Sequence, residues 1–433
     1  MSRKSVLSAV AASNGAFEAA ARRIAGQQQH RSFTSTPQRN ANITQFTPTS
    51  SPSLDSLLND IRTKIILPSY LPMAQRKKIY SRKWEKKLQA DPIIIEIDGE
   101  VLKFRYQNPL TDLPSALKSM TAAVARFETA ADFANLKPLL EGLHYAGRKM
   151  HPSYAAKILR LVGRKGRVYD MIDCARSVRR TGYKLDTSEK VNMMLHYVQM
   201  KARDADWDVA ETRQALRWAE MVVEMLHEEA HQPKRGKSNP LLPGEIPLNR
   251  DPMVLAAPLH LAAILAARHK AGEPILEKTG KEQEAGKEQE VDEEQKAAEE
   301  QKAGKGVLGR VHKLARDIVA LWPEGRKMKE LQPAELYTDF DKMGYLLQPE
   351  KFVTLATPLL HGLETAVKVV EPELLASQLQ TRCDTLKPEI LEAQAAAMEI
   401  KKARVLAAEN EKLRTRFSRE LRSEEVYRKF YGA

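Results

Sequence analysis

A helical unit of about 35 residues that recurs along the chain constrains the fold more than any other feature of the sequence. Gly147 and Gly182 occupy equivalent places in this spacing, and two helical patterns separated by Gly166 lie between them. The apolar positions of these patterns are Tyr154, Ile158, Leu161 and Val162 in the first, and Val168, Met171, Ile172, Ala175 and Val178 in the second. One helical hairpin cannot bury its apolar face alone, whereas stacked hairpins can. The recurrence therefore predicts a short solenoid.

Residues 152–186 resemble one pentatricopeptide repeat. The matching positions are Tyr154, Lys165-Gly166-Arg167, Ala175, Gly182 and Asp186, where that motif has an aromatic residue, a turn, a small packing residue, a glycine and a terminal acid. A weaker copy ends at Gly147, and a third copy with a longer second helix covers about 187–229. The resemblance implies helix–turn–helix units that bind RNA. A generic α-solenoid or helical bundle is the alternative.

The rest of the chain predicts a mainly α protein with a small β-hairpin before the solenoid and a long C-terminal helix. Two β-rich runs flank Asp98-Gly99, a dipeptide that suits a tight hairpin turn. Residues 271–306 repeat Gly-Lys-Glu-Gln-Glu and contain no aromatic residue, which predicts disorder or a marginal, solvated helix. The expected segments are 1–40 (transit peptide), 41–90 (basic arm with short helices), 91–110 (hairpin), 111–230 (repeats), 231–270 (loop and helix), 271–306 (insert) and 307–433 (C-terminal helices, the last starting near Pro388).

The first 50 residues predict import of the protein into mitochondria. They hold six basic residues against one acid, Glu18, and are rich in Ser, Thr and Ala. The run from Val6 to Ile24 can form an amphipathic helix, and 31–36 resembles a matrix-processing site with cleavage near Phe33. This composition is typical of a presequence, although an ordinary basic tail is the alternative. The predicted location is the mitochondrial matrix.

Composition excludes several classes of protein. Two cysteines, Cys174 and Cys383, rule out a disulfide framework and a zinc site built from cysteines. No run reaches the roughly 18 apolar residues of a membrane-spanning helix. His227 and His231 are four residues apart, but no third ligand has metal spacing nearby. We therefore predict no catalytic residue, no metal, no cofactor, no small-molecule substrate and no enzymatic activity.

Basic residues instead predict a polyanionic partner. The formal net charge is +13, and most of it lies outside the first 50 residues. Residues 147–184 contain eleven Lys and Arg against two acids, and the segment 62–87 contains nine against one, interleaved with Tyr70, Tyr80 and Trp84. A solvated charged face is the alternative to RNA contact. The predicted RNA-binding residues are Arg76, Lys77, Lys78, Arg82, Lys83, Arg148, Lys149, Arg160, Arg164, Lys165, Arg167, Arg176, Arg179 and Arg180.

The mode of RNA contact is predicted to ignore base identity. Pentatricopeptide repeats read bases through polar residues near the start of the first helix, but Ala155, Ala156, Val191 and Asn192 stand there. Alanine and valine offer no hydrogen bond to a base edge. The segment 70–87 is expected either to thread along folded RNA or to form a short amphipathic helix packed on the solenoid.

Taken together, these features resemble lineage-specific mitochondrial ribosomal proteins of fungal type, including the opening 67–72 with Gln75-Arg76-Lys77. The resemblance implies a structural ribosomal protein that binds rRNA and neighbouring ribosomal proteins, and we expect it in the large subunit. A pentatricopeptide-type factor for mitochondrial mRNA stability, processing or translation is the first alternative. An assembly scaffold for a respiratory complex is the second.

Overall fold

The computed structural model describes residues 43–233, 242–274, 293–339 and 342–432. The predicted transit peptide at 1–40 lies outside these residues. The chain divides into a small unit, of which Ile43 and 97–100 are described, and a large unit of 44–96 and 101–433. Within the small unit, the backbone N–H of Ile43 donates to Oδ2 of Asp98 at 2.8 Å.

The predicted β-hairpin is confirmed. Strands β1 (Ile93–Ile97) and β2 (Glu100–Phe104) form a two-stranded sheet. Asp98 and Gly99 at the turn have φ angles of 51° and 79°, the pair of positive values that a two-residue hairpin turn needs. Along β1 buried and exposed side chains alternate, with Ile93 and Ile95 inside.

Short helices lie before and after Pro68 and Pro72. Helix α2 (Pro52–Ile61) continues into a π-helical turn at Arg62–Ile66 and a 3₁₀ turn at Leu67–Tyr70. Leu54, Leu58 and Ile61 repeat at helical spacing and are buried. The basic segment that follows folds as α3 (Met73–Ile79), a 3₁₀ turn at Arg82–Trp84 and α4 (Glu85–Ala90).

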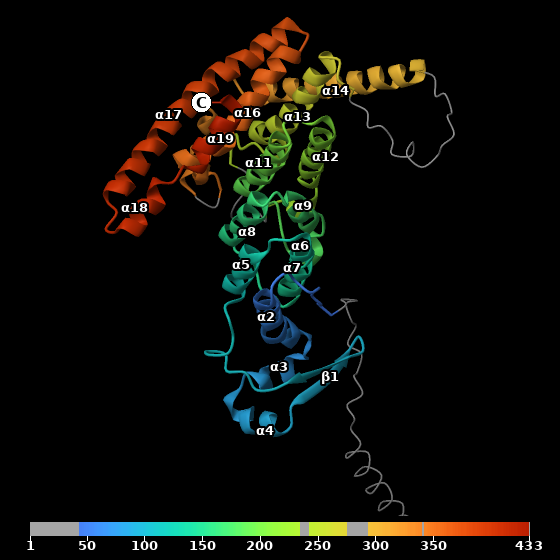
Figure 1. The fold of residues 1–433 in the computed structure, drawn as a ribbon, viewed down its shortest axis with the longest axis vertical. Helices are drawn as coiled ribbons and strands as arrows, with labels where there is room; N and C mark the ends of the chain where they lie inside the picture. The colour runs from blue at the N-terminus through green and yellow to red at the C-terminus, as the bar shows by residue number, and fades with distance from the viewer. Residues whose placement is uncertain (1–42, 234–241, 275–292, 340–341, 433) are drawn as a thin grey trace, which may run out of the picture. The chain divides into compact units, whose positions relative to one another are not determined.

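Eight helices then form successive packed pairs, which are followed upward in Figure 1. Each pair packs on the next, as α5 does on α8, α8 on α11, and α9 on α12. Gly147, Gly166 and Gly182 all have positive φ, as helix-ending glycines do. The helices are α5 (Ala116–Arg126), α6 (Ala130–Ala134), α7 (Leu136–Tyr145), α8 (Pro152–Arg164), α9 (Val168–Arg176), α10 (Val178–Thr181), α11 (Ser188–Asp204) and α12 (Val209–Met225).

This arrangement confirms a mainly helical fold with a small hairpin before the helices. Helix pairs that pack in sequence are also what a generic helical stack contains. The pentatricopeptide resemblance of 111–230 therefore stays a prediction.

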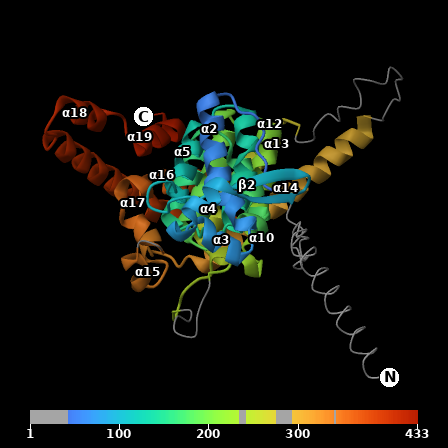
Figure 2. The ribbon, with the colours of Figure 1, turned by 90° about the horizontal axis from the view of Figure 1, so that it is seen from below.

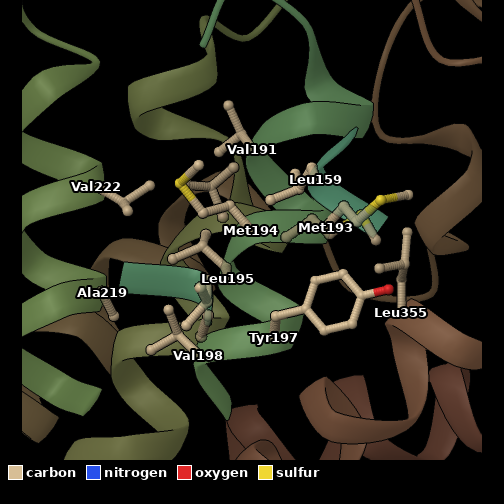
Figure 3. Packing of buried hydrophobic residues seen from close by; sticks show 14 of the residues in the cluster. Leu159, Val191, Met193, Met194, Leu195, Tyr197, Val198, Ala219, Val222 and Leu355 are labelled. Atoms are coloured by element: carbon tan, nitrogen blue, oxygen red, sulfur yellow. The ribbon is translucent and has the colours of Figure 1, made fainter. Parts of the chain in front are cut away.

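Two helices supply much of the core. Helix α11 is buried from Lys190 to Met200, and Figure 3 shows its Met194 and Val191 on the side of Val222 and its Val198 on the side of Ala219, both residues of α12. After 3₁₀ turns at Glu229–His231 and Leu248–Arg250, α13 (Pro252–Lys270) packs against α11, α12, α14 and α16. Its length and hydropathy would allow it to cross a membrane, but 83% of the relevant window is buried inside the fold. A core helix with neighbours around it has the same composition.

Over the last part of 271–306 the structure has the helical alternative and not disorder. Helix α14 (Glu293–Leu321) begins well before residue 307, while 275–292 lie outside the described residues. Gly304 explains how the polar stretch joins the fold, because a Cβ there would lie 2.0 Å from Nε2 of His269 on α13. The missing side chain lets α14 lie against α13, so packing stabilises a helix that composition alone would leave marginal.

The long C-terminal helix was placed wrongly. We expected it to start near Pro388 and to run to the end of the chain, but α17 spans Glu373–Leu406 with Pro388 inside it. Leu375, Leu379, Leu386 and Ile390 are buried on both sides of the proline, and α17 packs on α16. Tertiary packing therefore outweighs the proline as a start signal.

The chain after α17 turns back in two short helices, α18 (Glu411–Ser418) and α19 (Arg422–Tyr431). Figure 2 shows this reversal beside α17, and α19 packs on α16. The remaining elements are 3₁₀ turns at Met328–Glu330 and Gly344–Leu347, α15 (Ala334–Thr338) and α16 (Pro349–Val369).

Candidate nucleic-acid interface

The basic segment before the hairpin is a folded structure and not an extended arm. Ile79 and Leu88 are buried at 0% and 4% exposure. The Trp84 ring lies between two cations, with Nζ of Lys78 at 4.8 Å and Nζ of Lys87 at 5.4 Å from its centroid. The segment is therefore helical, as the amphipathic alternative expected, but its buried Ile79 and Leu88 are not part of the hydrophobic cluster of the repeat helices. Lys77, Arg82 and Lys83 are the predicted binding residues of this segment that remain exposed, while Arg76 and Lys78 are half-buried.

Several cations predicted to bind RNA have partners inside the fold. Nζ of Lys165 donates to the carbonyl of Ala125 in the last turn of α5 and to that of Phe127, its C-cap residue. Arg167 pairs with Asp170 at 2.7 Å and lies over the Phe133 ring. These contacts cap or join helices.

Arg180 is paired as well, with Glu141 of α7 at 2.9 Å, although its side chain is 73% exposed. Its guanidinium can therefore face solvent while it joins α10 to α7. Ion pairs at exposed positions contribute little to stability.

The other predicted cations do not form one continuous ridge. Arg160 and Arg164 of α8 line one cavity, and Arg179 lines another with Lys184. The two cavities share no lining residue. Arg148, Lys149 and Arg176 are exposed at the α7–α8 turn and at the end of α9. The structure thus divides the predicted set between separate surfaces.

The positions that would read bases in a pentatricopeptide repeat are inside the core. Ala155 and Ala156 are 5% and 3% exposed, and Val191 is fully buried. Asn192 is 5% exposed, and its Nδ2 donates to Oγ of Ser188 and to the hydroxyl of Tyr345, both at 3.0 Å. These side chains cannot reach a base without unfolding, so direct reading of bases through them is excluded in this fold.

Four cations that sequence reasoning missed join Arg160 and Arg164 at their cavity. They are Lys351 at the start of α16, Lys401 and Arg404 on α17, and Arg422 at the start of α19. Nothing in their spacing along the chain could have revealed this, because only the packing of α16, α17 and α19 brings them together.

Among the described residues, no three His, Cys, Asp or Glu side chains gather closely enough to hold a metal ion. His227 contacts Asn249, whereas Nδ1 of His231 accepts from the backbone of Leu185 at 3.1 Å. Both cysteines are buried and unpaired.

Known proteins identify the family. The family model described as "Mitochondrial ribosomal protein mS27" matches residues 31–288 and 294–416. The Neurospora crassa protein "Small ribosomal subunit protein mS27" is 34% identical over 368 residues, which cover 84% of this chain and 87% of the relative.

The chain belongs to the mS27 family of mitochondrial ribosomal proteins.

Membership of the mS27 family decides several expectations. It confirms a mitochondrial ribosomal protein, a component of a ribonucleoprotein that serves translation and has a structural and not an enzymatic role. The expectation of a large-subunit protein is wrong, because the N. crassa mS27 is a protein of the small subunit. Basic composition, on which the prediction rested, is common to proteins that bind RNA and carries no information about the subunit.

Proposed function

We propose that this mS27-family chain is a structural component of the small subunit of the mitochondrial ribosome in the matrix, where it contacts rRNA and neighbouring ribosomal proteins. The observation that carries the proposal is its 34% identity, over 84% of the chain, to a small-subunit mS27. Its net charge of +13 suits a partner made of phosphates.

The RNA contacts are proposed for cations that face solvent. Lys77, Arg82, Lys83, Arg148, Lys149, Arg176 and Arg179 are exposed. Arginine and lysine at such positions neutralise phosphates without sensing base identity. The burial of Ala155, Ala156 and Val191 supports the same mode, since the side chains that could read bases are inside the fold.

Sedimentation of mitochondrial extract through a sucrose gradient tests the proposal. We expect the protein in the small-subunit and monosome fractions at low salt, and crosslinks from it to small-subunit rRNA. Sedimentation with the large subunit alone, or absence from every ribosomal fraction, would refute the assignment. Crosslinks to a few mRNAs without rRNA would favour the transcript factor, and co-purification with a respiratory complex would favour the assembly scaffold.

A further inference from the structure

A cavity lies next to Arg160 and Arg164 in the large unit. It has a volume of about 540 Å³, within the range of about 300–1,000 Å³ of pockets that hold small molecules. Residues of α8, α11, α16 and α17 and the first turn of α19 line it. Its charged lining residues are six cations and one acid: Arg160, Arg164, Lys351, Lys401, Arg404, Arg422 and Glu350.

Carboxylates that are not part of the cavity lining form ion pairs with some of these cations but not with all of them. Glu189 pairs with Arg160 at 3.5 Å and with Lys351 at 2.7 Å. Lys401 pairs with Glu424 at 2.9 Å, and Arg422 with Glu425 at 2.7 Å. Arg164 and Arg404 have no carboxylate partner among the described residues, and both are exposed. The cavity therefore keeps an excess of positive charge at these two side chains.

A buried imidazole in the lining has no partner. His196 is 3% exposed, and within the described chain neither of its ring nitrogens has a hydrogen-bond partner. Burial lowers the pKa of this imidazole to about 3, so the ring is neutral at pH 7 and offers one donor and one acceptor. Nε of Arg422 is buried and unpartnered at the same cavity. Buried polar groups normally have hydrogen-bond partners, so two unpartnered groups at one cavity point to a ligand.

Most of the rest of the wall is apolar, apart from Gln348 and Thr354. Met193, Tyr197, Leu355 and Ile400 line the cavity. Figure 3 shows Met193 and Tyr197 of α11 on the side that faces Leu355 of α16. The apolar wall suits the face of a base, and the neutral imidazole can donate to and accept from the polar edge of that base. The two cations without a carboxylate partner suit a phosphate.

We propose that this cavity holds one nucleotide of single-stranded RNA, with its phosphate at Arg164 and Arg404 and its base or ribose edge at His196. The proposal rests on the proposed function, since it takes RNA to be the partner. An acidic protein segment fits less well, because a carboxylate accepts hydrogen bonds and cannot satisfy the acceptor nitrogen of a neutral imidazole.

Binding of a short fluorescein-labelled single-stranded RNA to the full chain, measured by anisotropy, tests the proposal. We expect the double variant Arg164→Glu/Arg404→Glu to raise Kd at least about tenfold, since two phosphate contacts become repulsive. The matched control is Lys302→Glu/Lys305→Glu, which makes the same change of charge at exposed positions of α14 and should leave Kd within about twofold of wild type. Equal effects of the two variants would mean that net charge and not the cavity sets affinity, which would overturn the proposal.

His196→Leu separates a binding role from a structural one. Leucine has nearly the volume of histidine and removes both unpartnered nitrogens, so thermal stability should stay the same or rise. Affinity for the single-stranded RNA should nevertheless fall several-fold. A variant that is as stable as wild type and binds equally well would contradict a nucleotide at His196.

Three further results distinguish the failure of the cavity proposal from the failure of the proposed function. If wild type sediments with the small subunit and the cavity variants bind RNA normally, the cavity proposal fails while the proposed function stands. If the double variant leaves the subunit but keeps its affinity for the single-stranded RNA, the cavity holds an acidic protein segment and the proposal is wrong. If wild type itself neither binds RNA nor sediments with ribosomes, the proposed function fails first.

Discussion

Gly362 lies where α16 crosses α13, and its missing side chain sets how closely the two helices approach. A Cβ at this position would lie 2.5 Å from Cβ and 3.0 Å from Cα of His260. The obstacle is therefore partly backbone and cannot rotate away. Gly362→Ala should lower the free energy of unfolding by about 1–3 kcal/mol through overpacking, as measured by urea denaturation.

The control for this substitution is Gly306→Ala in α14. Nothing lies within 4 Å of a Cβ at Gly306, so alanine should stabilise the helix by about 0.5–1 kcal/mol. If both variants were equally stable, the close approach of α13 and α16 would not be a packing constraint.

Asp132 joins α6 to the chain before α2. Its carboxylate accepts hydrogen bonds from N and Oγ of Ser50, both at 2.8 Å, and from the backbone N–H groups of Glu128 and Thr129, both at 2.9 Å. Burial alone would raise its pKa, but these bonds hold the pKa of Asp132 far below its ordinary value.

The stabilisation by Asp132 should therefore depend on pH. A carboxyl whose pKa is lower in the folded state stabilises the fold above its unfolded pKa, near 4, and loses this effect as the pH falls through the folded value. Asp132→Ala should cost about 1.5–3 kcal/mol at pH 7 and clearly less at pH 3, measured by urea denaturation at both values. An equal loss at both pH values would show that the charge of Asp132 is not what stabilises the fold.

At the scale of elements, two histidines join α13, α16 and α19. Nε2 of Gln199 lies 3.0 Å from Nδ1 of His260, and Nε2 of His260 lies 2.9 Å from Nδ1 of His361. The amide donates to Nδ1 of His260, which leaves the Nε2 hydrogen of His260 to donate to His361. Trp207 stacks on the His361 ring, and Phe430 of α19 lies 5.3 Å from that ring. The network thus uses both imidazoles in their neutral form.

The contacts of His260 and His361 between these helices should weaken in mild acid. Burial lowers the pKa of His361 to about 4 and that of His260 well below its ordinary value of 6.5. The unfolded chain gains protons below pH 6.5 that the folded chain does not, so stability is complete above pH 6.5 and falls as the pH drops from there. We expect a loss of about 1–2 kcal/mol from His361 between pH 7.5 and 5, visible as a lower Tm.

The variant that tests this assignment is His361→Gln, whose amide oxygen can still accept from His260 but does not titrate. It should reduce the fall in Tm between pH 7.5 and 5. His227→Gln, at an exposed histidine, should leave the fall unchanged. If Tm fell by the same amount in wild type and in both variants, His361 would not be the source of the pH sensitivity.

Elements were predictable where a local pattern matched local packing. The hairpin at Asp98-Gly99 and the glycine ends at Gly147, Gly166 and Gly182 follow from φ preferences that neighbours do not change. The starts of α14 and α17 differ from those expected, because packing on α13 and α16 overrides composition and Pro388. Local sequence patterns do not reveal such tertiary contacts.

At the scale of the whole molecule, the sequence predicted a basic RNA-binding protein but not where its cations meet. Arg160 and Arg164 were identified from a local cluster, whereas Lys351, Arg404 and Arg422 reach the same cavity from distant segments. Conversely, Lys165 and Arg167 belong to the local cluster but cap and join helices. A run of charge shows that a partner is anionic, and only the fold shows which charges are available to it.

The salt dependence of RNA binding measures how many of these charges are used. For single-stranded RNA, the slope of log K against log salt concentration changes by about 0.7 for each phosphate that a cation neutralises. Arg164→Gln/Arg404→Gln removes the cations at one phosphate and should therefore make the slope shallower by about 0.7, while Lys302→Gln/Lys305→Gln should leave it as in wild type. Neutral glutamine keeps hydrogen-bonding capacity, so a change of slope reports ion pairing with phosphates and not a loss of shape. An unchanged slope in the cavity variant would mean that Arg164 and Arg404 release no counterions on binding, and the exposed cations at Arg148, Lys149 and Arg176 would then carry the electrostatic contact.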